Sequence, residues 1–125
     1  MKIKTSDHDT MASFESAMMA TSLGIPEDIS PIFWGVSGKN RGKILEYSQY
    51  DQPKIPAPSI ASLIFFANSI GITINHRSKN GYYLSDDDNK TLVAGSDFNK
   101  TVDLFIRVKM IHELNKRNIS GKNDI

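Results

Sequence analysis

Apolar residues recur at helical spacing in three stretches of the chain. The first stretch follows three candidate capping residues, Asp7, Asp9 and Thr10, and ends near Leu23, just before a glycine and a proline. Four apolar side chains share one face of this stretch: Met11, Phe14, Ala17 and Met18. The pattern predicts a helix that buries one face.

The second stretch is "SIASLIFFANSI", which follows Pro58. Five of its apolar residues form a single stripe: Ile60, Leu63, Ile64, Ala67 and Ile70. Ala61 and Phe65 project to the opposite side. Phe65 has two alternatives: the proline-rich segment before the helix folds over it, or it contacts another protein chain, because aromatic residues are enriched at interfaces.

The third stretch begins after Ser96 or Asp97, either of which can cap it, and reaches about Arg117. Its apolar residues surround nearly the whole helix: Val102, Leu104, Phe105, Ile106, Val108, Met110, Ile111 and Leu114. A helix that is apolar all round needs cover on more than one side. A second subunit would supply part of this cover, so we expect a homo-oligomer with Phe105 and Met110 at its interface.

Short stretches rich in β-branched and aromatic residues lie between these helices. "PIFWGV" and "KILEY" flank the turn-rich "SGKNRG" and predict a hairpin. "SQYDQPKIPAP" then predicts an extended linker, because its prolines cannot donate backbone hydrogen bonds. Three more strands are predicted after the second helix, at residues 72–76, 82–85 and 91–94.

The predicted order of elements is therefore α-β-β-α-β-β-β-α. Short turns join most of the strands, so the sequence predicts an α+β fold in which one antiparallel sheet of about five strands packs against three helices. We expect a single domain over residues 1–118. Residues 119–125 are polar at most positions, and we expect them to form a flexible tail.

Composition narrows the class of protein. The chain has 125 residues and no cysteine, which excludes cysteine-ligated zinc, iron–sulfur clusters and thiol catalysis. Its start lacks the apolar stretch of a signal peptide. The longest apolar run, residues 60–67, is far shorter than the roughly 20 residues that cross a bilayer. We expect a cytoplasmic protein with no membrane contact and no cofactor.

The segment after the second helix bears on DNA binding. A basic hairpin that follows a helix is typical of winged-helix proteins, and His76, Arg77 and Lys79 lie near the tip of this one. The preceding helix, however, carries no lysine or arginine to reach bases and phosphates. The net charge of +1 is also low for a nucleic-acid-binding protein. We expect no sequence-specific binding of nucleic acid.

Patterns for catalysis and metal binding do not emerge from the sequence. The three histidines, His8, His76 and His112, are not spaced as metal ligands. "GVSGKNRGKI" departs from a phosphate-binding loop at Ser37 and Ile44, where that loop needs a glycine and a hydroxyl residue. No acid–base pair is evident. A binding protein is favoured, and an enzyme that acts on a nucleotide stays an alternative.

Five residues are candidates for holding a small anionic ligand: Arg77, Lys79, Tyr82, Tyr83 and Arg107. Tyr82 and Tyr83 occupy successive strand positions and so point to opposite faces of a sheet. One of them can stack on a base while the other packs inward, although ordinary sheet packing accounts for both. For Arg107 the alternatives are an anionic ligand and an ion pair with Asp103, four residues earlier in the helix.

The second half of the chain presents its features in an order known from one family. "YSQYDQP" precedes a helix that starts as "PS-x-A", the strands "GITIN" and "GYYLSD" follow, and the last helix begins with Asn99, Val102 and Ile106. Over about residues 47–114 this order resembles the small phage proteins of the αβα-sandwich type, including the NinX-like proteins of lambdoid phages. The chain departs from them at Leu63, where an aromatic residue is usual, and at Lys100, where a proline is common.

The resemblance implies a phage or prophage accessory protein that acts by binding in the host cytoplasm. One such role is counter-defence, in which the protein sequesters a small anionic or nucleotide signalling ligand. The alternative is an inhibitor that binds a host protein through Trp34, Phe65 or the hairpin tip. The resemblance brings no catalytic residues to carry over.

Overall fold

The computed structural model describes residues 10–123, and this part of the chain contains three α-helices and five short strands. The elements are α2 (Phe14–Ser22), β1 (Phe33–Gly35), β2 (Lys54–Pro56), α3 (Ile60–Ser69), β3 (Asn75–Ser78), β4 (Tyr82–Ser85), β5 (Leu92–Gly95) and α4 (Phe98–Asn123). Single 3-10 turns lie at Glu27–Ile29, Gly38–Asn40 and Tyr47–Gln49. The predicted α+β class is confirmed for these residues, and the order of elements agrees broadly with the prediction, although the second strand lies in a different segment.

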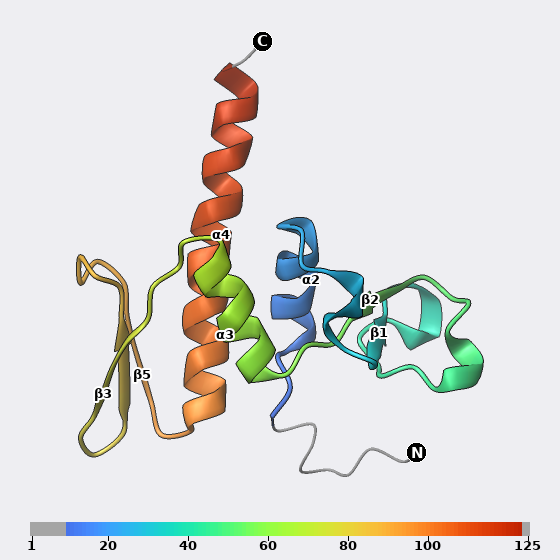
Figure 1. Ribbon diagram of the computed structural model, residues 1–125, viewed down its shortest axis with the longest axis horizontal. Helices are drawn as coiled ribbons and strands as arrows, with labels where there is room; N and C mark the ends of the chain where they lie inside the picture. The colour runs from blue at the N-terminus through green and yellow to red at the C-terminus, as the bar shows by residue number, and fades with distance from the viewer. Residues whose placement is uncertain (1–9, 124–125) are drawn as a thin grey trace.

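The strands form two antiparallel sheets, not the single sheet that the sequence predicts. β1 pairs with β2, and β3, β4 and β5 pair in that order. Between the two sheets runs α4, which contacts β4 and β5 as well as α2 (Figure 1). The two groups of strands are separated by α4, which packs on the three-stranded sheet, and by α2, which packs on β2.

The hydrophobic core forms around α4. Its buried members include Leu63 and Phe66 from α3, Leu84 from β4, and Val102 and Ile106 from α4. Phe105 and Met110 are also fully buried within this chain. The cover that an apolar helix requires thus comes from the three-stranded sheet, α2 and α3. Phe105 and Met110 are core residues, and they do not lie on a surface that a second subunit could contact.

The helix α2 begins at Phe14 with Ser13 as its cap, three residues after Thr10, the last of the predicted caps. Residues 10–12 are extended instead, because their backbone pairs with the segment before α3: the Ala12 N–H donates to the Pro58 carbonyl (2.9 Å), and the Ile60 N–H donates to the Thr10 carbonyl (2.8 Å). Ser13 then caps α2, its hydroxyl accepting the Ser16 N–H. Asp7 and Asp9, the other predicted caps, lie outside the described residues.

The predicted hairpin between "PIFWGV" and "KILEY" is wrong in its second strand. β1 pairs instead with β2, in the register Phe33–Pro56, Trp34–Ile55 and Gly35–Lys54. "KILEY" contributes only a single bridge, from Ile44 to Trp34. The proline-rich linker becomes a strand because Ile55 and the following Ala57 bury their side chains, and an edge strand tolerates proline at positions that need no N–H.

The second half follows the sequence more closely. Ser59 caps α3 by accepting the Ser62 N–H (3.1 Å), and Asp97 accepts the Lys100 N–H (2.9 Å) at the start of α4. The helix α4 runs to Asn123, beyond the end predicted near Arg117. Phe65 is 77% exposed, so the proline-rich segment does not cover it.

Candidate functional site

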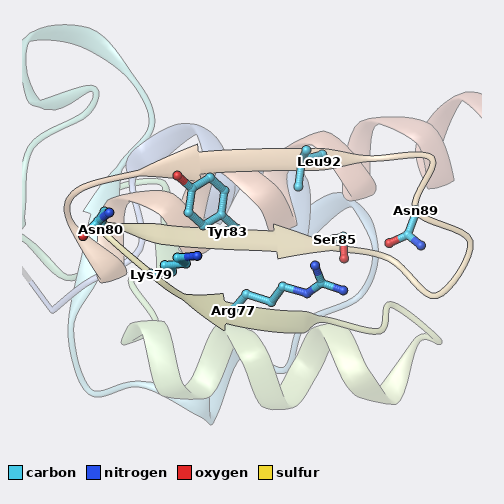
Figure 2. A pocket seen from close by; sticks show the side chains of 7 residues that line it. All are labelled: Arg77, Lys79, Asn80, Tyr83, Ser85, Asn89 and Leu92. Carbon is cyan, nitrogen blue, oxygen red and sulfur yellow. The ribbon is translucent and has the colours of Figure 1, made fainter.

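The outer face of the three-stranded sheet, turned away from α4, carries an open hollow of about 610 Å³. We call it the sheet-face hollow. Its walls come from β3, β4, β5 and the two turns that join them (Figure 2). Seven residues line it: Arg77, Lys79, Asn80, Tyr83, Ser85, Asn89 and Leu92.

Strand register explains why these side chains share one face. Tyr83 is paired with Arg77 on one side and with Ala94 on the other, and Ser85 is paired with Leu92. Side chains alternate between the faces of a sheet, so positions 77, 83, 85 and 92 all project outward. The inner face carries Leu84 instead, which is fully buried in the core beneath the sheet.

The charge of the hollow is positive. Arg77 and Lys79 are exposed, and their side chains form no ion pair or hydrogen bond with any residue that the structure describes. No carboxylate is among the seven lining residues. Two uncompensated cations beside each other favour an anion, and a guanidinium can hold a phosphate or carboxylate through two parallel hydrogen bonds.

An apolar flank completes the hollow on the side of β4 and β5. The side chains of Tyr83 and Leu92 are 39% and 67% exposed, and both face the hollow. An exposed tyrosine ring can stack on the planar ring of a ligand, with the aliphatic side chain of Leu92 as a neighbouring contact. The hollow therefore combines a cationic edge on β3 with an apolar flank on β4 and β5.

Tyr82 does not contribute to this hollow, although it was one of the five candidates. Its ring packs on the inner side of the sheet against His76, with ring centroids 5.7 Å apart, and against Phe98, at 5.3 Å. The predicted opposite orientation of the two tyrosines follows directly from the strand. Tyr83 faces outward, and Tyr82 packs the sheet against Phe98, the first residue of α4.

Arg107 is also separate from the other candidates. It lies in a second hollow of about 490 Å³ between the starts of α2 and α4, which Trp34, Lys100 and Asp103 help to line. The predicted ion pair with Asp103 is absent from the described residues: the carboxylate of Asp103 accepts the Ser13 N–H (2.8 Å), and the guanidinium of Arg107 lies 3.9 Å from Glu15. The sequence-based set of five thus divides into three groups.

Four residues of the sheet-face hollow escaped prediction. Ser85 and Leu92 could have been found by extending the strand alternation from Tyr83 and across the next turn. Asn80 and Asn89 were interpreted only as turn residues. Both adopt a positive φ of 56°, which asparagine tolerates better than most residues, and they place amide groups at opposite ends of the hollow (Figure 2).

An ion pair that the sequence did not indicate lies at one end of this site. The Lys109 ammonium on α4 donates to a carboxylate oxygen of Asp86 at 3.0 Å, in the turn between β4 and β5. This hydrogen bond, aided by the backbone N–H groups of Thr91 and Lys90, lowers the pKa of Asp86 from 3.8 to about 2, against the opposing effect of burial. Asp86 is therefore ionised at neutral pH.

Metal sites, membrane-spanning helices and similarity to known proteins would each point to other classes of function. Within the part of the chain that the structure describes, no cluster of three or more histidine, aspartate or glutamate side chains could hold a metal ion. No helix in that part is long and apolar enough to cross a membrane. Comparison with family models, curated proteins and solved structures found no match to this chain.

Proposed function

We propose that the protein acts by binding a small anionic ligand with a planar ring, such as a nucleotide, in the sheet-face hollow. The observation that carries this proposal is a conjunction on one face: Arg77 and Lys79 without partners, the exposed ring of Tyr83 beside them, and no carboxylate in the lining. Each of these features is common on protein surfaces. Their combination in one hollow fits a ligand that is both charged and flat.

In this binding mode the anionic group lies over β3, between Arg77 and Lys79, and the ring lies on Tyr83 beside Leu92. Stacking on a tyrosine contributes ~1–3 kcal/mol. Each charged hydrogen bond contributes about 1 kcal/mol here, because the hollow is open to water and salt. One stack and two such hydrogen bonds sum to about 3–5 kcal/mol, so binding should be weak, with a Kd of roughly a millimolar.

The role of such binding is sequestration without turnover. The lining contains neither histidine nor a carboxylate, the most frequent general acids and bases, and binding alone is therefore the role that we propose. The resemblance to phage proteins adds a setting to this proposal: a phage or prophage protein that withdraws a nucleotide signal in the host cytoplasm.

A second candidate is binding to another protein, which the exposure of Phe65 favours. This phenylalanine is 77% exposed on α3, and the neighbouring Ala61 is exposed as well. Large aromatic side chains with this exposure are typical of contact sites. A host protein or a second copy of this chain would cover it. Sedimentation of the wild type and of Phe65→Ser at tens of micromolar separates self-association from a monomer.

Calorimetric titration with a panel of nucleotides, cyclic ones included, tests the main proposal. Tyr83→Ala should weaken the binding of any nucleotide that the wild type binds by roughly 5- to 150-fold, the equivalent of one stacking contact. Tyr47→Ala is the matched control, because Tyr47 is 87% exposed and lies outside the hollow. For the cations, Lys79→Ala is compared with Lys39→Ala, another exposed lysine. A wild type that binds no member of the panel contradicts the proposal and favours the protein-binding candidate.

A further inference from the structure

The turn between β4 and β5 is organised around one side chain. One carboxylate oxygen of Asp86 accepts the backbone N–H of Lys90 (2.8 Å) and, at 3.4 Å, that of Thr91. The carbonyl of the same residue accepts the Asn89 N–H (3.0 Å). Asp86 is only 7% exposed, so these bonds are shielded from competing water. Asp86 thus accepts three backbone N–H groups of its own turn, two through its carboxylate and one through its backbone carbonyl.

The second carboxylate oxygen ties the turn to the core. It accepts a hydrogen bond from Lys109 (3.0 Å), which lies on α4 between the buried Ile106 and Met110. The side chains of Lys109 and Asp86 are 22% and 10% exposed, so the pair is more sheltered than a surface salt bridge. The turn is therefore tied to α4 through this pair.

This turn carries part of the sheet-face hollow. Asn89 stands in it with a positive φ of 56°, and Leu92 is the first residue of the strand that follows. Both line the hollow. We infer that Asp86, held by Lys109, is a positioning residue for the proposed ligand site: it sets the turn that places Asn89 and Leu92. This inference rests on the proposed function for its consequence in binding, while its claim about the turn can be tested alone.

If the Asp86 carboxylate acted only through its charge, it would repel an anionic ligand. Replacing any carboxylate near the hollow removes a repulsion and should strengthen anion binding slightly. Loss of turn order has the opposite effect, because a disordered Asn89 and Leu92 must be ordered again when ligand binds. Asp88 separates the two effects. It lies in the same turn with the same charge, and it forms no hydrogen bond or ion pair with the described residues.

The test compares Asp86→Ala with Asp88→Ala in two measurements. Without nucleotide, amide hydrogen exchange followed by NMR should speed up by about tenfold or more at Lys90 and Thr91 in Asp86→Ala, because each N–H loses its side-chain acceptor, and it should not change in Asp88→Ala. With AMP as the probe, Asp86→Ala should raise the Kd about threefold or more by the same reasoning. Asp88→Ala should leave the Kd unchanged or lower it.

Lys109→Met keeps the Asp86 carboxylate that accepts the Lys90 and Thr91 N–H groups, and this variant serves if Asp86→Ala does not fold. It should shift both measurements in the same direction by smaller factors. Unchanged exchange at Lys90 and Thr91 in the Asp86 variant, or in Lys109→Met in its place, overturns the inference whatever AMP does. Equal changes in Kd for the two aspartate variants overturn it as well. If the wild type binds no nucleotide, the proposed function fails. Faster exchange in Asp86→Ala but not in Asp88→Ala would still show that Asp86 orders the turn.

Discussion

Two adjacent tyrosines show how the two faces of one small sheet differ. Tyr82 and Tyr83 are neighbours on β4 and have the same side chain. Tyr82 points toward α4 and packs against His76 and Phe98, while Tyr83 points outward beside Arg77 and Leu92. The inner face continues into the core through Leu84, and the outer face ends in an open, positively charged hollow. The inner face therefore stabilises the fold, and the outer face is available for binding.

The largest effect that this comparison predicts is on the inner face. Leu84→Ala removes a fully buried side chain and should lower the free energy of unfolding by ~2–5 kcal/mol, measured by urea denaturation. Leu92→Ala makes the same chemical change on the outer face, where the side chain is 67% exposed, and should cost less than about 0.5 kcal/mol. Similar losses for the two variants would show that the faces do not differ as described.

The tyrosines sharpen the comparison further. Tyr82→Ala should lower the free energy of unfolding by ~1–3 kcal/mol, because it loses two aromatic contacts together with buried area. Tyr83→Ala should cost less, since Tyr83 is 39% exposed on the outer face. Nucleotide affinity should show the reverse order in calorimetric titration. A variant pair that loses stability and affinity in parallel would contradict the separation of roles.

The acid stability of the turn gives a third, smaller effect. The folded pKa of Asp86 is about 2, below its ordinary value of 3.8. Its ionised form therefore contributes stability that is fully present above the ordinary value and is lost as the pH falls through about 2. Lys109→Met should be less stable than the wild type at neutral pH, and the difference should shrink across this acid window. A difference that does not change with pH would exclude the ion pair as its source.

The smallest effect concerns the second hollow. Arg107→Ala should leave nucleotide affinity unchanged, because Arg107 shares no lining with Arg77, Lys79 and Tyr83. Its ion pair with Glu15 is long and mostly solvated, so the free energy of unfolding should fall by less than about 0.5 kcal/mol. Isothermal titration and urea denaturation of this one variant measure both quantities. A loss of affinity would place the ligand in the hollow between α2 and α4 instead.

The parts of the fold that the sequence predicted well depend on local signals. The strand β4 was predicted with its observed bounds because a glycine turn precedes it and an acidic turn follows. The buried stripe of α3 follows from apolar residues that lie within one or two turns of helix of each other. In the same way, strand alternation predicted that Tyr82 and Tyr83 point to opposite faces of the sheet, as the structure has them.

The parts that were missed depend on contacts between distant segments. The start of α2 is set by pairing of residues 10–12 with residues 58–60. The partner of β1 is a proline-rich segment that buries Ile55, where composition favoured a linker. Asp103 is satisfied by the Ser13 N–H, 90 residues away in the chain, and not by its helical neighbour Arg107. Local sequence patterns do not reveal such long-range pairings. The sequence therefore grouped Arg107 with Arg77, whereas the two residues line separate hollows.

An NMR titration with AMP and cyclic nucleotides tests most directly which face of the sheet meets a ligand. The ring protons of Tyr83 and the methyl groups of Leu92 should shift with ligand concentration in the wild type. The ring of Tyr82 and the methyl groups of Leu84, on the inner face of the same strand, should shift much less. No shift at Tyr83 with any nucleotide, or shifts centred on Trp34 and Leu104 in the second hollow, would contradict the assignment of function to the outer face.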